Sequence, residues 1–197
     1  MFWQTTRFHV DLSQPRVMGI VNVTPDSFSD GGRHFAADAA RAHCEQLLQE
    51  GADMLDIGGE STRPGAQPVS ADDEWARVQA VLQHALTLGV PVSVDTYKPQ
   101  VMQWALDAGA DIINDVWAMR WRGDSAGASH HATNAAQVIA QHGSCGVCLM
   151  HMHREPQTMQ SAPMEGDAVP QVAQFLREAA LALEAAGVAR ARICLDY

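Results

Sequence analysis

The sequence predicts an α/β fold, an incomplete TIM (β/α)8 barrel of about five βα units followed by a sixth strand. Short apolar, β-rich runs alternate with Ala-rich segments of helical periodicity, and these runs are apolar on both faces. Polar residues also stand at the ends of most runs. A length of 197 residues, of which 47% are hydrophobic, suits one substantial core, so we expect a single domain over residues 1–197.

The elements follow one another in regular order along the chain. The expected strands cover residues 17–23, 54–57, 90–94, 112–114, 146–150 and 193–195. The expected helices cover residues 36–50, 71–88, 99–108, 135–142 and 169–186. Several helical segments end next to a glycine, which is a common helix stop. Strands that alternate with helices in this way indicate a parallel sheet covered by helices.

Two parallel architectures compete, and the residues after the strands favour the barrel. A dinucleotide-binding sheet would carry G-x-G-x-x-G after its first strand, and nothing like it follows Val23. The segment GADMLDI at 51–57 resembles GADIIND at 109–115, and the offset of 109 − 51 = 58 residues is about two βα units. A closed barrel needs eight units and about 250 residues. The sequence therefore predicts a barrel that is truncated before its last βα units.

Composition limits the partners that the chain can have. The net charge of −10 argues against nucleic acid and anionic membranes as partners, because both require a basic face. No apolar run approaches the roughly 20 residues of a membrane span. Four cysteines in a chain of this size do not suggest a disulfide scaffold, so the cytoplasm is the expected location.

Three polar residues at strand ends form the first candidate site. Asp95, Asn114 and Asp196 follow the third, fourth and sixth expected strands, so their side chains should converge at the mouth of the barrel. Carboxylates and an amide in this arrangement suit a flat heterocycle with several N–H donors. For Asp95 alone, capping of the helix that begins near residue 99 is an alternative.

Two loops at the same mouth carry groups suited to an anion. Asn22 follows the first strand and offers a carbonyl oxygen to Mg²⁺, an ion that prefers a few protein oxygens together with water and phosphates. Asp26 or Asp30, in the loop that follows, can interact with developing positive charge. The glycine-rich loop GGESTRPG at 58–65 offers backbone N–H groups and Arg63, which can bind phosphate or carboxylate. Ordinary surface turns are the alternative for both loops.

Five longer motifs in order identify a family. They are MGIVNVTPDSFSDGG at 18–32, DIGGESTRPGA at 56–66, SVDTYKP at 93–99, GADIINDV at 109–116 and CLMHM at 148–152. From residue 16 to residue 196 the chain resembles dihydropteroate synthase. The resemblance implies a transferase of folate biosynthesis that joins p-aminobenzoate to 6-hydroxymethyl-7,8-dihydropterin diphosphate and releases diphosphate and 7,8-dihydropteroate. It also implies a homodimer.

The resemblance assigns roles to residues of this chain. The pterin would be held by Asp95, Asn114 and Asp196. The Mg²⁺–diphosphate site would include Asn22, and Thr62 would touch the diphosphate end of the substrate. Asp30 and Arg63 would belong to loops that order around the diphosphate and the aminobenzoate pocket.

The chain departs from the family after its sixth strand. The family continues there with Asp-Pro-Gly-Phe-Gly-Phe-Gly-Lys, whereas here Asp196 is followed by Tyr197 alone. We therefore expect the isolated chain to be a poor or inactive catalyst. The alternatives are a non-catalytic pterin-binding remnant and a pterin-dependent methyltransferase barrel. The two anion-binding loops argue against the methyltransferase, which has no diphosphate to hold.

Overall fold

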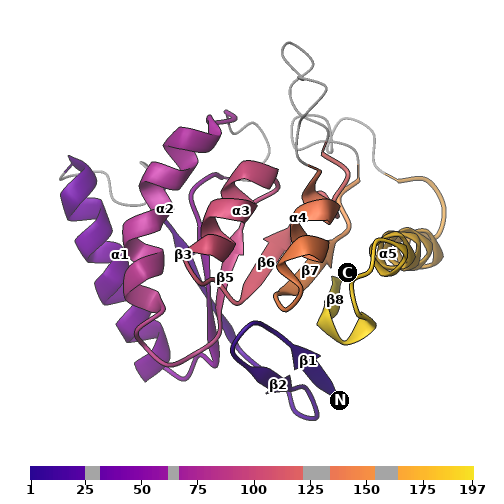
Figure 1. The fold of residues 1–197 in the computed structure, drawn as a ribbon, viewed down its shortest axis with the longest axis horizontal. Helices are drawn as coiled ribbons and strands as arrows, with labels where there is room; N and C mark the ends of the chain where they lie inside the picture. The colour runs from indigo at the N-terminus through magenta and orange to yellow at the C-terminus, as the bar shows by residue number, and fades with distance from the viewer. Residues whose placement is uncertain (25–31, 62–66, 122–133, 154–163) are drawn as a thin grey trace.

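The computed structural model describes residues 1–24, 32–61, 67–121, 134–153 and 164–197. Its centre is a six-stranded parallel sheet whose strands lie side by side in chain order (Figure 1). The strands are β3 (Met18–Asn22), β4 (Met54–Gly58), β5 (Val92–Asp95), β6 (Ile112–Asp115), β7 (Gly146–Met150) and β8 (Ile193–Asp196). Sequential order without a reversal is the order of a barrel wall, as expected from the sequence.

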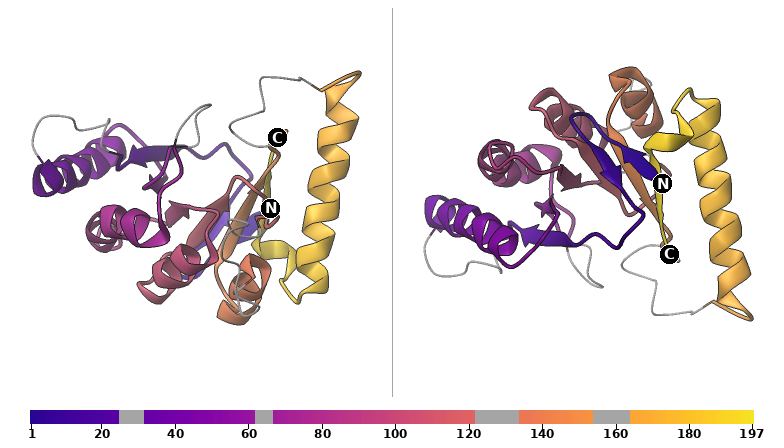
Figure 2. Two further views of the ribbon diagram at one scale, coloured as in Figure 1. Left: turned by 90° about the horizontal axis from the view of Figure 1, so that it is seen from above. Right: turned by 90° about the horizontal axis from the view of Figure 1, so that it is seen from below.

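The helices pack on the outer side of this curved sheet. They are α1 (Gly32–Gln49), α2 (Ala71–Ala85), α3 (Pro99–Asp107), α4 (Ala135–His142) and α5 (Ala168–Ala185). Figure 2 shows α1 to α4 following one another around the sheet, with α5 beside β7 and β8. Within the described residues, no helix is both long and apolar enough to cross a membrane.

The main core fills the layer between the sheet and the helices. Leu55, Ile57 and Val94 from the strands and Leu82 and Met102 from the helices are all fully buried there. All five residues of β4 are buried, which explains why its sequence shows no alternation of apolar and polar side chains. Burial of such side chains, at about 1.5–3 kcal/mol each, is what holds the helices on the sheet.

The predicted elements are all present, with some shifted ends. The strand predicted from residue 90 begins two residues later, at Val92, because Pro91 has no N–H for the sheet ladder. The helix predicted to reach residue 88 ends at Ala85, and turn hydrogen bonds such as Thr87 N–His84 O follow it. Helix α1 begins at Gly32, four residues before the predicted start.

An N-terminal β-hairpin was not predicted. It pairs β1 (Phe2–Gln4) with β2 (His9–Asp11) in antiparallel register. Trp3 is buried in a second, smaller core together with Val10, Met54 and Ile112, and its indole Nε1 donates to Arg192 O at 2.8 Å. Strands of three residues carry little pattern, so the packing against the sheet, rather than the local sequence, decides this hairpin.

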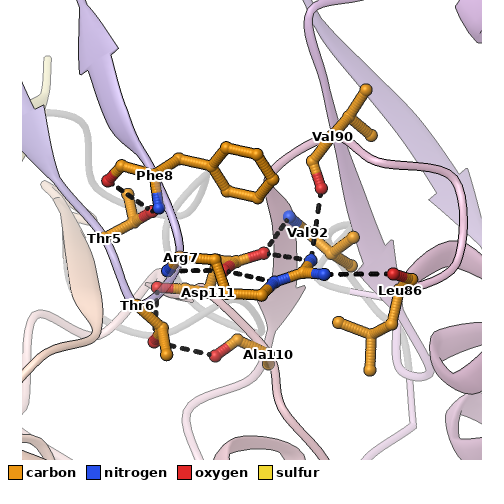
Figure 3. A network of polar contacts seen from close by, with 9 residues as sticks. All are labelled: Thr5, Thr6, Arg7, Phe8, Leu86, Val90, Val92, Ala110 and Asp111. Atoms are coloured by element: carbon orange, nitrogen blue, oxygen red, sulfur yellow. Dashed lines mark hydrogen bonds and ion pairs between the residues drawn. The ribbon is translucent and has the colours of Figure 1, made fainter.

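An ion pair fixes the hairpin turn to the N-terminal end of the sheet. Figure 3 shows the Arg7 side chain running toward Asp111, directly before β6. Asp111 is fully buried and accepts bonds from Arg7 N, Nε and Nη2, at 3.1, 3.0 and 2.7 Å. Its second oxygen also accepts from Val92 N at 2.9 Å. The hairpin therefore covers the end of the sheet opposite the polar strand ends, as Figure 1 also shows.

Candidate functional site

The strand register brings the predicted polar residues to one edge of the sheet. Asn22, Gly58, Asp95 and Asn114 occupy successive paired positions on β3, β4, β5 and β6. Asp56 lies two residues before Gly58 and therefore shares its face of β4. The carboxyl ends of four neighbouring strands thus present their polar groups together, where barrel enzymes have their active sites.

Asp56 and Asn114 are joined by a hydrogen bond within the site. The Asn114 amide donates from Nδ2 to Asp56 Oδ2 at 3.0 Å, and Asp56 is only 3% exposed. Burial raises the pKa of Asp56, and the neighbouring Ser93 hydroxyl and Asn114 amide partly oppose this shift. Among the described residues, the buried oxygen Asn114 Oδ1 has no hydrogen-bond partner. A buried acceptor left without a partner costs free energy, so this atom is suited to receive an N–H from a ligand.

Asp95 is the second acceptor of the site, half-buried on the strand between Asp56 and Asn114. Burial, followed by the neighbouring Asp56 carboxylate, raises the pKa of Asp95 well above its usual range. Ligand N–H donors that pair with this carboxylate would favour its ionised form again. The capping interpretation of Asp95 is wrong, because the N-cap residue of α3 is Lys98.

Asn22 lies beside the same acceptors. A Cβ atom placed on Gly58 would be 3.6 Å from Asn22 Oδ1 and 3.6 Å from Asp95 Oδ2. The two oxygens therefore lie close to this glycine, one from each neighbouring strand. The described residues contain no group of three His, Cys, Asp or Glu side chains able to hold a metal. Asn22 Oδ1 is thus a neutral oxygen that lies next to the Asp95 carboxylate.

The loop after β6 is held in an unusual conformation. Ala118 and Met119 have positive φ angles of 48° and 63°, which non-glycine residues rarely adopt. The fully buried Asp115 carboxylate accepts from Trp117 N at 2.8 Å and from Met119 N at 2.6 Å, which stabilises this turn. Burial raises the pKa of Asp115 to about 6.

The remaining predicted site residues are more distant or lie outside the described part of the chain. Asp196 is exposed at the end of β8, opposite Met150, and one strand, β7, separates it from β6 and Asn114. Asp26, Asp30, Thr62 and Arg63 fall outside the described residues.

The sequence places Asp56 among the polar residues at the strand ends but assigns it no binding role. The available signal was a carboxylate inside a short apolar strand, two residues before a glycine at the strand end.

Comparison with known proteins places this arrangement in a family. Residues 18–197 match the model of the pterin binding enzymes, so the chain belongs to that family. It is 49% identical over 196 residues to a dihydropteroate synthase of Neisseria meningitidis serogroup B, covering 98% of this chain and 65% of that protein. It is 43% identical over 188 residues to the Escherichia coli K12 dihydropteroate synthase, with 95% and 62% covered.

Solved structures agree in fold as well as sequence. The Burkholderia cenocepacia dihydropteroate synthase complexed with 7,8-dihydropteroate is 47% identical, with a TM-score of 0.81, and 100% of this chain covers 62% of it. The Xanthomonas albilineans enzyme with 4-aminobenzoic acid is 46% identical, with a TM-score of 0.82, and 96% of this chain covers 63% of it. The chain therefore spans less than two thirds of the length of these relatives.

Proposed function

We propose that the protein carrying this chain is a dihydropteroate synthase. It would condense p-aminobenzoate with 6-hydroxymethyl-7,8-dihydropterin diphosphate in folate biosynthesis. The observation that carries the proposal is the Asp56–Asn114–Asp95 group, in which the half-buried Asn114 amide is oriented so that its buried oxygen has no hydrogen-bond partner among the described residues. Relatives with 47% and 46% identity whose structures contain 7,8-dihydropteroate or 4-aminobenzoic acid support the same substrates.

The residues of the site would act by binding and orientation. Asp95 would accept two N–H groups from the guanidine-like edge of the pterin, as carboxylates do from a planar fork. Asn114 would accept a further N–H through Oδ1, while Asp56 holds the amide in that orientation. Asp196 would contact the pterin from β8. Diphosphate departure would leave a cationic pterin methylene for attack by the aromatic amine, a step that positioning can accelerate without a covalent enzyme intermediate.

The predicted Mg²⁺ would be held by Asn22 together with substrate phosphates and water. Its chemistry is to spread the charge of the leaving diphosphate. Thr62, Asp30 and Arg63 keep their predicted roles at the diphosphate and aminobenzoate ends. The homodimer and the cytoplasmic location also stay predictions, as does the absence of nucleic acid and membrane partners.

Binding and turnover together test the proposal. Calorimetric titration with 6-hydroxymethylpterin should show binding to the protein and a loss of at least about 100-fold in affinity for Asp95→Ala, whose carboxylate would otherwise pair with ligand donors. Diphosphate should appear only when the pterin diphosphate and p-aminobenzoate are both present. Pterin binding without diphosphate release would favour a non-catalytic pterin-binding protein, and no pterin binding at all would refute the proposal.

A further inference from the structure

The chain contains a single lysine, Lys98, and this lysine is buried. Its exposure is 5%, although lysines are almost never buried unless they are paired. The ammonium group forms ion pairs with Glu60 and, at 2.5 Å, with Glu74 Oε2. It also lies 4.4 Å from the centre of the Tyr97 ring. Apart from histidines, all other basic residues of the sequence are arginines, so Lys98 is the one position with an ammonium side chain.

Glu60, two residues after the end of β4, is the first partner of the Lys98 ammonium group. Its side chain is 10% exposed, and Oε1 accepts from the Tyr97 hydroxyl at 2.7 Å. Glu60 therefore has two partners on the segment that follows β5, Tyr97 and Lys98. The backbone of residues 58–60 is tied in this way to the neighbouring strand end.

Helix α2 holds the same segment from the other side. Glu74, which is 1% exposed on α2, is the second partner of Lys98. Arg77 donates to Gly59 O at 2.8 Å. A Cβ atom on Gly59 would lie 2.8 Å from Val78 Cγ1, so the backbone packs against α2 with no room for a side chain. Contacts from α2 and from the β5 end thus fix residues 59 and 60 together.

This segment adjoins the candidate site directly. Gly58 is paired with Asn22 on one side and with Asp95 on the other. Lys98 itself follows Asp95 by three residues. A displacement of residues 58–60 would therefore change the spacing between Asn22 and Asp95 without removing either side chain.

We propose that Lys98 is a positioning residue for the pterin site: by holding Glu60 against Glu74 it fixes residues 58–60 between Asn22 and Asp95. The proposal rests on the proposed function for the identity of the ligand. A purely stabilising ion pair is the competing explanation. The two differ because stability can be recovered by restoring charge balance, whereas positioning requires the ammonium group itself.

Three variants separate the two explanations. Lys98→Met leaves two carboxylates without their cation, and Lys98→Met/Glu74→Gln removes one of those charges. Arg7→Met is the matched control, since it breaks another ion pair to a buried carboxylate at the opposite end of the sheet. Each variant is measured by urea unfolding and by calorimetric titration with 6-hydroxymethylpterin, at a temperature where unfolding shows that it is folded.

We expect pterin affinity to fall about tenfold in Lys98→Met, which is the effect of weakening about one hydrogen bond between the site and the ligand. The double variant should regain stability but not affinity, and Arg7→Met should lose stability while keeping wild-type affinity. Wild-type affinity in the double variant, or an equal loss in Arg7→Met, would overturn the proposal. Failure of the wild type to bind pterin would instead count against the proposed function.

A measurement that leaves Lys98 in place covers the case in which the Lys98 variants do not fold. In protein labelled with ¹³C-lysine, Glu60→Gln should shift the Lys98 Cε resonance, because it removes one of the two carboxylates on that ammonium group. Addition of 6-hydroxymethylpterin to the unsubstituted protein should shift the same resonance. A resonance that responds to Glu60→Gln but not to bound pterin would overturn the coupling of Lys98 to the site.

Discussion

Replacing Arg7 by methionine should lower the free energy of unfolding by about 3 kcal/mol. Methionine keeps much of the apolar stem but removes the guanidinium group, which bonds to Asp111 and to the carbonyls of Leu86 and Val90. Asp111 would remain fully buried with two backbone donors, Arg7 N and Val92 N. The variant therefore leaves a buried carboxylate without its cation.

The magnitude follows from the two lost side-chain bonds to Asp111. Hydrogen bonds to charged groups contribute roughly 1.5–3 kcal/mol each. The Arg7 side chain is 36% exposed, so water replaces part of what the guanidinium loses, and the lower end of that range applies. Two bonds at roughly 1.5 kcal/mol give about 3 kcal/mol, the lower edge of the 3–5 kcal/mol found when buried pairs are broken.

Urea unfolding followed by circular dichroism measures this loss directly. The double variant Arg7→Met/Asp111→Asn should lose less than the sum of the two single variants, because the buried charge is removed with its partner. A loss below about 1 kcal/mol in Arg7→Met, or full additivity in the double variant, would refute the reasoning. The first result would mean that the pair behaves like a surface ion pair.

Three further outcomes are expected. Burial raises the pKa of Asp115 to about 6, against 3.8 when unfolded, so its stabilising contribution is present below about pH 4 and is lost as the pH rises through 6. The size of this contribution is (6 − 3.8) × 1.36, or about 3 kcal/mol. In urea unfolding, the stability of the wild type should therefore fall relative to that of Asp115→Asn between pH 4 and pH 7. Gly59→Ala should cost about 1–3 kcal/mol, because its methyl group would lie 2.8 Å from Val78 Cγ1, and an unchanged thermal midpoint would contradict this packing. Asp56→Ala should weaken 6-hydroxymethylpterin binding about tenfold by releasing the Asn114 amide, and calorimetry with an unchanged affinity would exclude that role.

The wall of the barrel follows from local pattern. Strand β4 is buried on both faces and is followed by a strongly periodic helix, so both its type and its parallel pairing could be predicted. The hairpin of β1 and β2 could not. Trp3 is buried by residues far along the chain, including the Arg192 carbonyl that its indole meets 189 positions away.

The site was predictable only in part for a related reason. Strand ends identified Asp95 and Asn114, because position relative to a parallel strand is enough to place them at the mouth. The strand-end pattern gave no binding role to Asp56 or Lys98, since their roles depend on partners from other elements. These partners are an amide 58 residues away for Asp56, and the Glu60 and Glu74 carboxylates for Lys98.

By itself, the sequence determined the βα alternation, the order of the polar strand ends and the resemblance to a pterin-binding family. These features depend on periodicity and on spacing along the chain, and both can be read directly from the sequence. The tertiary structure alone decided which polar groups meet. The register placed Asn22, Gly58, Asp95 and Asn114 in one row, and burial decided that Asp56 and Lys98 must find partners there. Burial and pairing depend on distances between separate elements, so packing must bring those elements together before either takes effect.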